Sequence, residues 1–326
     1  MKRFKILGTG TALPKRVMTN ADLEKVVETS DEWIRERTGI HERRIADEKT
    51  SSATLGARAM KAACDQAGIE PDSVDAIIVS TSSADAIFPS TACWVQHELG
   101  IRGMPAFDVA AGCSGFLYAL EVASSMLSAG TCKRIAVIGA EVMSKVVNWE
   151  DRTTCVLFGD GAGAAIIETC EEDRGLLASN WGADGNLAPI LHAPAGGTRM
   201  PASAETVAKN LHTVTMQGRS VFRHAVRAMT EAGVKAVEDA GLSADQIDLL
   251  IPHQANMRIM EACRVRLNVP EEKMFSIVHR YGNMSAATIP VALHEAREAG
   301  RVVDGSVVAF AAFGAGLTWA GAVVRF

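Results

Sequence analysis

The chain has 326 residues, of which 48% are hydrophobic and 22% are charged, a balance typical of a globular protein large enough for two packed halves. Its net charge of −5 argues against nucleic-acid binding by the chain as a whole, and no apolar run approaches the roughly 20 residues of a membrane span. The seven cysteines form no C-x-x-C pair and, with the histidines, show no metal-ligand spacing, so we expect a cytoplasmic protein without a disulfide framework or a metal.

The first 80 residues are predicted to alternate strands and helices. Hydrophobic periodicity sets the element type, and capping residues and glycines set the helix ends. The predicted elements are a strand over 4–8, a helix capped by Asn20 and running to about Val27, a helix capped by Ser30 and ending at Gly39, a helix over 53–67 stopped by Gly68, and a strand over 75–79.

Cys113 lies where a strand meets a helix. An apolar run over 104–109 precedes it, and a helical pattern over 117–127 follows it. Free N–H groups and the positive end of the helix dipole favour a thiolate, so we expect the pKa of Cys113 to fall below about 8.5. The flanking Gly112 and Gly115 leave room for a reacting group. Cys113 is therefore a candidate nucleophile, although a buried inert thiol, the state assumed for the other six cysteines, is the alternative.

The second half of the chain repeats the first at an offset of about 170 residues. Matching segments are 63–69 with 236–242, 75–78 with 248–251, 112–113 with 282–283, and 135–138 with 307–310. The strands are short continuous apolar runs, as expected when helices cover both faces of a sheet. This internal duplication predicts two similar α/β halves, residues 1–170 with the cysteine and residues 171–326, that share a helical layer. Residues 192–215 look like a loop bordering the site.

The duplication brings three polar side chains into one hypothesis. Cys113 and Asn283 occupy equivalent helix starts, and His253 follows the strand 249–251, where an α/β sheet forms a crevice. Each residue alone has a structural alternative, a core histidine or a helix-capping asparagine. Together, a thiol, an imidazole and a carboxamide suit acyl transfer followed by carbon–carbon bond formation, with two hydrogen-bond donors on a developing enolate oxygen.

Several motifs in order along the whole chain resemble the β-ketoacyl-acyl-carrier-protein synthase III family. They are residues 8–10 with 13–14, 30–34, 37–40, 108–116, 158–163, 252–256, 281–285 and 313–316. The resemblance implies an α/β thiolase-like fold with two duplicated halves in α-β-α-β-α layers, and an acyltransferase that initiates fatty-acid synthesis.

The family resemblance implies a role for each of these residues. Cys113 would take the acyl group from acyl-CoA, acetyl-CoA by default, while His253 and Asn283 would assist decarboxylation of malonyl-acyl-carrier protein. The backbone N–H groups of Cys113 and Ala315 would form the oxyanion hole; the family often has glycine where this chain has Ala315.

The resemblance also implies binding residues. The expected CoA contacts are Trp33, Arg37, Arg152 and Asn256; the acyl pocket Met143, Phe158 and, from a neighbouring subunit, Phe88; and the carrier-protein contacts Arg223, Arg258, Arg264 and Arg266. It further implies a homodimer that needs no cofactor, since acyl-CoA is a substrate.

Other functions stay open at this point. A related condensing enzyme or acyltransferase of secondary metabolism would carry the same three residues, a silent acyl-binding scaffold would keep the fold, and a cysteine hydrolase would release free acid. The glycines at 8–10 and 159–163 lack the spacing of a dinucleotide-binding loop.

Overall fold

Nine strands form one continuous mixed sheet in the computed structural model, which describes residues 2–326. The strands are β1 (Lys2–Ala12), β4 (Ala76–Ser80), β5 (Ala106–Val109), β6 (Arg134–Val142), β7 (Asp160–Thr169), β8 (Gly175–Ala183), β11 (Leu249–Pro252), β12 (Val307–Gly314) and β13 (Thr318–Arg325). Their order is β11-β12-β13-β8-β1-β7-β6-β4-β5. The halves meet between β1 and β8, where Lys2↔Leu176 and Arg3↔Gly175 pair among the described residues.

The two halves of the sheet have the same topology apart from β5, an extra strand that runs parallel to β4 at the edge of the first half. In the first half β4 runs parallel to β6, β6 antiparallel to β7, and β7 antiparallel to β1. In the second, β11 runs parallel to β12, β12 antiparallel to β13, and β13 antiparallel to β8. The predicted duplicated α/β fold is therefore confirmed. The division at residue 170, between β7 and β8, stays a prediction.

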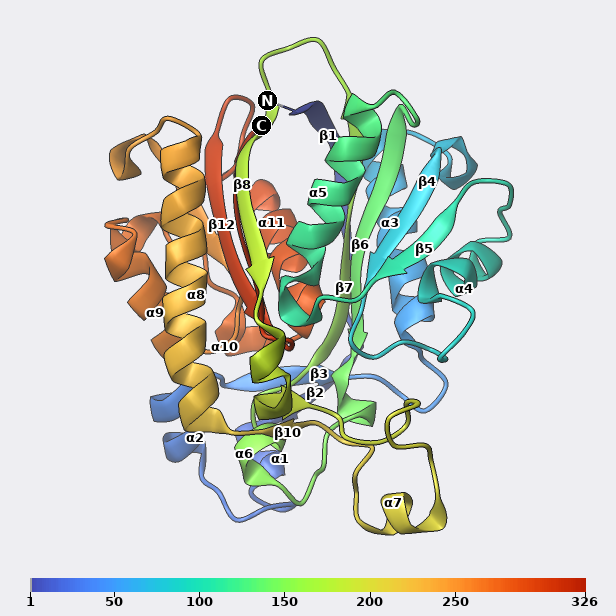
Figure 1. The fold of residues 1–326 in the computed structure, drawn as a ribbon, viewed down its shortest axis with the longest axis vertical. Helices are drawn as coiled ribbons and strands as arrows, with labels where there is room; N and C mark the ends of the chain where they lie inside the picture. The colour runs from blue at the N-terminus through green and yellow to red at the C-terminus, as the bar shows by residue number, and fades with distance from the viewer. Residues whose placement is uncertain (1) are drawn as a thin grey trace.

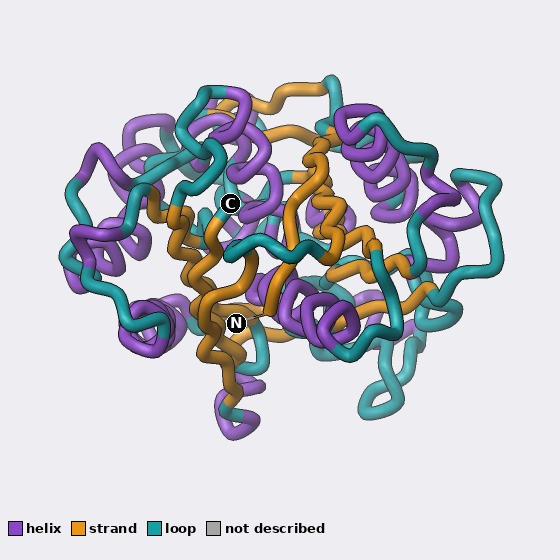
Figure 2. The backbone as a smooth tube through the Cα atoms, turned by 90° about the horizontal axis from the view of Figure 1, so that it is seen from above, coloured by secondary structure: helices purple, strands orange, loops and turns teal. Residues whose placement is uncertain are grey.

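Helices form three layers around the sheet halves (Figures 1 and 2). Helix α3 (Ser52–Ala67) contacts β1, β6 and β7, and α8 (Gly218–Asp239) contacts β8, β12 and β13. Between the halves lie α5 (Gly115–Ser128) and α11 (Thr288–Glu298), each of which touches strands of both. The layers are thus α-β-α-β-α. Because sheet covers the central helices on two sides, they are apolar around most of their circumference.

The glycines of β1 serve helix packing. A Cβ atom at Gly8 would lie 2.2 Å from the carbonyl oxygen of Ala63, and one at Gly10 would lie 2.3 Å from the nitrogen of the same residue. Glycine therefore lets α3 approach the strand closely, which accounts for the Gly8-x-Gly10 pattern without a nucleotide.

The remaining elements are short. They are β2 (Arg16–Thr19), α1 (Asn20–Leu23), α2 (Asp31–Thr38), β3 (Glu42–Ile45), α4 (Thr91–Glu98), α6 (Arg152–Cys155), β9 (Leu191–His192), α7 (Ala204–Ala208), β10 (Thr215–Met216), α9 (Met257–Arg266) and α10 (Val278–Tyr281). Several of them, including α1, α2, α6, β2 and β3, gather at one end of the molecule (Figure 1). Within residues 2–326, no helix combines the length and apolarity that a membrane crossing requires.

The prediction for the first helix was wrong in two respects. Thr19, not Asn20, is the N-cap, and its side chain accepts a hydrogen bond from the Asp22 N–H. The helix then ends at Leu23 rather than near Val27. The Asn20 side chain is buried and forms hydrogen bonds with Asp31 and Arg43. Because it is engaged in these tertiary contacts, it does not cap the helix as the local pattern predicts.

Candidate active site

Cys113 lies in a 3-10 turn, η2 (Gly112–Ser114), between the end of β5 and the start of α5. Gly112 has a φ of +54°, and a Cβ atom there would lie 2.5 Å from the nitrogen of Ala315. A Cβ atom at Gly314 would likewise lie 2.5 Å from the nitrogen of Cys113. Two glycines thus allow the turns bearing Cys113 and Ala315 to touch, which places the two backbone nitrogens of the predicted oxyanion hole side by side.

The structure brings the three predicted chemical residues together. Cys113, His253 and Asn283 line one cavity of about 100 Å³, and Asn256 lines it as well. They come from the start of α5, the end of β11, and the turn after α10, so Cys113 meets two residues that lie 140 and 170 positions further along the chain, as the duplication predicts.

His253 is a buried, neutral imidazole. Its Nδ1 lies 2.7 Å from the Thr288 hydroxyl oxygen, which is also 3.0 Å from the Ser285 carbonyl oxygen. Burial lowers the pKa of His253 to about 3. Its Nε2 is buried and has no hydrogen-bond partner among the described residues. The rotation of the Thr288 hydroxyl decides which nitrogen carries the proton: turned to Nδ1, it leaves Nε2 as the donor.

Asn283 is held rigidly by its backbone. Its N–H donates to the Leu157 carbonyl at 2.8 Å, and its carbonyl accepts from Gly159 at 3.1 Å. Its side-chain Oδ1 accepts a 2.8 Å hydrogen bond from the Ser285 N–H. With Oδ1 occupied in this way, the Nδ2 amide is the part of the side chain that can donate to a ligand.

The expected low pKa of Cys113 was wrong for this structure. Although part of the residue is accessible, burial raises the pKa of its thiol to about 12, a hydrogen bond with the Ser285 hydroxyl opposes the rise, and the charge of Glu141 adds to it. Desolvation therefore raises the pKa of Cys113 by more than the position at a helix start lowers it, and Cys113 is a neutral thiol in the resting protein.

A second cavity of about 210 Å³ extends from Cys113 and is lined by Met143 and Phe158, as predicted for the acyl pocket. Ser82, Ser285 and Leu191 also line it, and no motif pointed to Ser82 or Leu191. His192 and Val214 do so too. The segment 192–215 therefore borders the cavity as predicted, but it is not loop throughout, because it contains α7. Phe88 is 82% exposed on this chain and lines neither cavity.

The predicted CoA residues form a cluster beside this site. The guanidinium carbons of Arg37 and Arg152 lie 5.9 and 5.2 Å from the Trp33 ring centroid. Helix α2 abuts the start of α9, because a Cβ atom at Gly39 would lie 2.7 Å from that of Met257. Asn256 caps α9 through a 3.0 Å bond from the Ile259 N–H. The Trp33 ring and its two neighbouring arginines thus form a platform near Asn256, which lines the cavity of Cys113.

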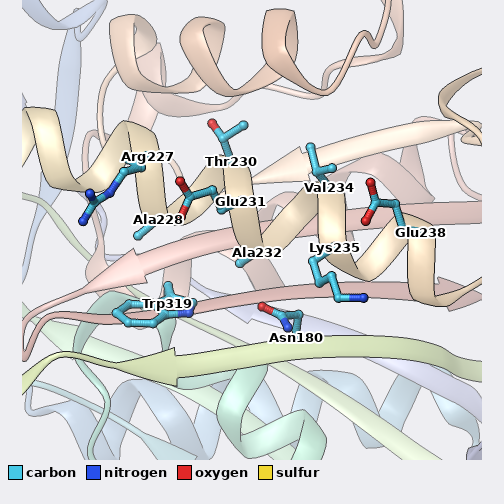
Figure 3. Close-up of a pocket in the computed structure, with 10 residues that line it drawn as sticks. All are labelled: Asn180, Arg227, Ala228, Thr230, Glu231, Ala232, Val234, Lys235, Glu238 and Trp319. Atoms are coloured by element: carbon cyan, nitrogen blue, oxygen red, sulfur yellow. The ribbon is translucent and has the colours of Figure 1, made fainter.

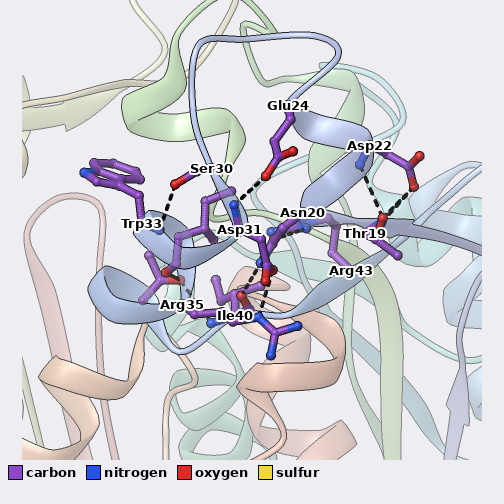
Figure 4. A network of polar contacts seen from close by, with 12 residues as sticks. Thr19, Asn20, Asp22, Glu24, Ser30, Asp31, Trp33, Arg35, Ile40 and Arg43 are labelled. Atoms are coloured by element: carbon purple, nitrogen blue, oxygen red, sulfur yellow. Dashed lines mark hydrogen bonds and ion pairs between the residues drawn. The ribbon is translucent and has the colours of Figure 1, made fainter.

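A buried arginine, Arg43, lies in a polar network with Asn20, Asp31 and the α2 residues around Trp33 (Figure 4). Arg43 is fully buried and donates to Asn20 Oδ1 at 2.8 Å and to the Val156 carbonyl at 2.9 Å. Asn20 donates in turn to Asp31, the first residue of α2, at 2.8 Å. Val156 directly precedes Leu157, the backbone partner of Asn283. No sequence motif pointed to this network.

The predicted carrier-protein residues separate into two groups. Arg223 and Arg266 line a surface hollow of about 620 Å³ with Phe222 and Arg227, and Arg258 lies 5.3 Å from the Phe222 ring centroid. Arg264 instead pairs with Glu261 and donates to the Val269 carbonyl at 2.7 Å. It therefore fixes the end of α9.

A groove of about 460 Å³ follows α8 where it crosses β8 and β13 (Figure 3). Arg227 and Lys235 alternate there with Glu231 and Glu238 above Trp319 and Asn180. The mixed charges and the absence of the predicted site residues from its lining separate it from the candidate active site.

The known proteins that the chain resembles belong to a family whose reaction suits the residues gathered in this cavity. Two family models, 3-oxoacyl-[acyl-carrier-protein] synthase III and its C-terminal part, match residues 107–185 and 237–326. The chain is 51% identical to a β-ketoacyl-[acyl-carrier-protein] synthase III of Caldanaerobacter subterraneus, over 98% of this chain and 97% of the other.

Two solved structures extend this agreement. The 3-oxoacyl-[acyl-carrier-protein] synthase III of Aquifex aeolicus superposes with a TM-score of 0.92 at 46% identity, covering 99% of this chain and 100% of that one. The priming β-ketosynthase of the R1128 polyketide pathway gives 0.91 at 32% identity, covering 99% and 96%. By sequence and by fold, the chain belongs to the 3-oxoacyl-[acyl-carrier-protein] synthase III family.

Proposed function

We propose that the protein condenses an acyl-CoA starter, by default acetyl-CoA, with malonyl-acyl-carrier protein, releasing CO₂ and CoA and initiating fatty-acid synthesis. The observation that carries this proposal is the single cavity lined by Cys113, His253 and Asn283. It combines a nucleophile with two neutral side chains able to donate hydrogen bonds.

The first half-reaction forms an acyl-enzyme. Cys113 Sγ attacks the thioester carbonyl of acyl-CoA, the carbon–sulfur bond to CoA breaks, and the thiol proton leaves with the CoA sulfur. The oxyanion of the tetrahedral intermediate would accept hydrogen bonds from the adjacent backbone N–H groups of Cys113 and Ala315. The Trp33 platform with Arg37 and Arg152 would hold the adenine and phosphates of CoA.

The second half-reaction uses the two neutral donors. The malonyl thioester oxygen would accept from His253 Nε2 and Asn283 Nδ2, so that loss of CO₂ leaves an enolate that these donors stabilise. Its carbon attacks the Cys113 thioester, the bond to Sγ breaks, and the thiolate takes up a proton. An imidazole with a pKa of about 3 suits this role, because it stays neutral throughout the physiological pH range.

The partners follow from the same proposal. Phe222 and the arginines around it would receive the acidic carrier protein, and Phe88, exposed on its own chain, would complete the acyl pocket of a second copy in a homodimer. The proposed reaction needs no cofactor beyond these substrates. We place it in the cytoplasm.

Mass spectrometry of the Cys113 peptide tests the proposal. Wild-type protein is incubated with a mixture of acyl-CoAs and then with malonyl-acyl-carrier protein; Cys113→Ser is the control. We expect a short acyl mass on wild type alone, discharged as a β-ketoacyl-carrier protein. A peptide that never acquires an acyl group would overturn the assignment.

The similarity to a priming polyketide synthase supports a second candidate, a condensing enzyme of secondary metabolism. The same assay separates the two, because that enzyme would load the peptide with another starter or discharge it to a different acceptor.

A further inference from the structure

Glu141 is a buried carboxylate that the proposed reaction does not use. It is the penultimate residue of β6, fully buried, and paired in register with Gly161 of β7. The rest of β6 from Ile135 to Val142 is apolar or glycine. A charge in such a place is costly unless many donors hold it, so its contacts indicate what it does.

Five donors from two separate segments converge on this carboxylate. Ser82 N–H donates at 2.9 Å and Ser83 N–H at 3.0 Å, and the Ser83 and Thr81 hydroxyls add to them. Across the site, the Ala286 N–H donates at 3.3 Å. Burial raises the pKa of the Glu141 carboxyl, and the hydrogen bonds that it accepts oppose the rise. Three of the donors are backbone N–H groups, which can only donate, so the contacts favour the ionised, acceptor-only form of the side chain.

The two clamped segments lie against the nucleophile. Ser82 and Ser285 line the same cavity as Cys113, and their hydroxyl oxygens are 3.3 Å apart. The Ser285 hydroxyl lowers the pKa of the Cys113 thiol and that of the Glu141 carboxyl, so it influences both groups. Ser285 adopts a φ of +45°, an unusual conformation for a non-glycine residue that the surrounding contacts must hold in place.

We propose that Glu141 is a positioning residue of this site: its carboxylate clamps the segment after β4 to the turn that carries Ser285, and its fixed negative charge opposes ionisation of Cys113 in the resting protein. The inference rests on the proposed function. In the acyl-enzyme the sulfur belongs to an uncharged thioester, so the Glu141 charge no longer has an ionisation to oppose once Cys113 is acylated. The resting thiol is thereby protected from adventitious electrophiles and oxidants, which react with thiolates.

Other ionisable groups near the cavity do not supply this charge. His253 is neutral, and His192 lines the outer part. The carboxylate of Asp160, on β7, is turned to Ser144 and the Ala46 N–H, and Asp85 accepts from the Ala53 N–H at the start of α3.

The test is the pH dependence of Cys113 alkylation by iodoacetamide, followed on its peptide by mass spectrometry, with the Cys170 peptide as internal control. In Glu141→Gln the midpoint of reactivity should fall by about one pH unit or more, so that Cys113 reacts about tenfold faster at a fixed pH below the midpoint. Glu141→Asp, which keeps the charge but loosens the packing, should stay close to wild type. Ser285→Ala, which keeps the donors of Thr81, Ser82, Ser83 and Ala286 but removes the Ser285 hydroxyl, should raise the midpoint.

These outcomes separate the effect of the Glu141 charge on Cys113 from the effect of looser packing around the site. Entry of water would lower the midpoint equally in Glu141→Gln and Glu141→Asp, and that result overturns the proposal, as does a Ser285→Ala midpoint that is unchanged or lower. If Glu141→Gln does not fold, the Asp and Ser285 variants still decide. The readout needs no condensation, so its failure is distinct from a failure of wild-type protein to make β-ketoacyl-carrier protein.

Discussion

At the residue scale, burial gives Cys113 and His253 protonation states opposite to those of a cysteine–histidine ion pair. The pKa of the thiol rises to about 12 and that of the imidazole falls to about 3. Both groups are therefore neutral at pH 7, and in the proposed reaction His253 would act on the substrate as a hydrogen-bond donor. The only hydrogen-bond partner of its Nδ1 among the described residues is Thr288. The orientation of the Thr288 hydroxyl therefore decides which ring nitrogen of His253 carries the proton.

Replacing this hydroxyl tests the tautomer argument. In Thr288→Val the His253 Nδ1 loses its partner at similar side-chain volume, and an unpaired buried group costs about 1–3 kcal/mol. We expect decarboxylation of malonyl-carrier protein to slow about tenfold or more, acyl loading of Cys113 to stay normal, and Thr288→Ser to restore the rate. Equal slowing of both half-reactions would contradict a specific effect on His253.

At the element scale, α2 and the segment after α6 are joined by Arg43. Burial lowers the pKa of this guanidinium to about 10, which keeps it charged at neutral pH, and its partners are oxygens of Met18, Asn20 and Val156. One side chain thus ties the helix that carries Trp33 to the segment after α6 that holds the backbone of Asn283.

Arg43→Met should separate these elements. The loss of three buried hydrogen bonds predicts a lower melting temperature and a several-fold higher KM for acyl-CoA, because α2 is no longer fixed. Arg35→Met is the matched control, since it breaks only the half-exposed ion pair with Asp31, worth about 0–1 kcal/mol. Equal effects of both variants would show that burial of Arg43 is not what matters.

The hollow between α8 and α9 gives a second prediction. Arg223→Glu reverses a charge in its lining, so the KM for malonyl-carrier protein should rise about tenfold, more at low salt than at high salt, with acyl-CoA loading unchanged. Lys133→Glu, an exposed reversal before β6, should have little effect. Steady-state kinetics with an unchanged KM in Arg223→Glu would count against carrier-protein docking here.

The sequence predicts those features of the fold and of the site that local or repeated patterns encode, and it does not predict the others. The duplication located Cys113 and Asn283 at equivalent turns, and apolar runs located β4, β6, β11 and β12, because both signals are local and repeated. The pKa of Cys113 depended on desolvation by distant segments, and the roles of Asn20 and Arg43 depended on partners up to 113 positions away. No local pattern carries that information.

At the scale of the whole molecule, the sheet ends in an open strand. Within residues 2–326, β5 pairs with β4 and with no other strand. Beside it lie α4 and the loop before it, with Ile87 84%, Phe88 82% and Trp94 38% exposed. An open strand next to large exposed apolar side chains is a ready surface for a second copy of the chain.

Phe88→Asp tests this surface. A charge at the centre of an apolar interface should convert a dimer into monomers at micromolar concentration, as measured by sedimentation velocity, and should lower loading by enlarging the acyl pocket. Val303→Asp, at a similarly exposed position in the second half (59%), should stay dimeric. A monomeric wild type, or a dimeric Phe88→Asp, would contradict the proposed assembly.

The two repeats are joined at the β1–β8 seam by two residue pairs, yet α5 and α11 are each covered by strands from both. Cutting the chain between β7 and β8 would leave each fragment with a helix whose second apolar face is bare. The fragments should therefore be insoluble when produced separately and regain structure only when made together. In evolutionary terms, this shared layer is the interface that two copies of a single repeat would form by dimerising, and the cavity of Cys113, His253 and Asn283 takes its residues from both repeats.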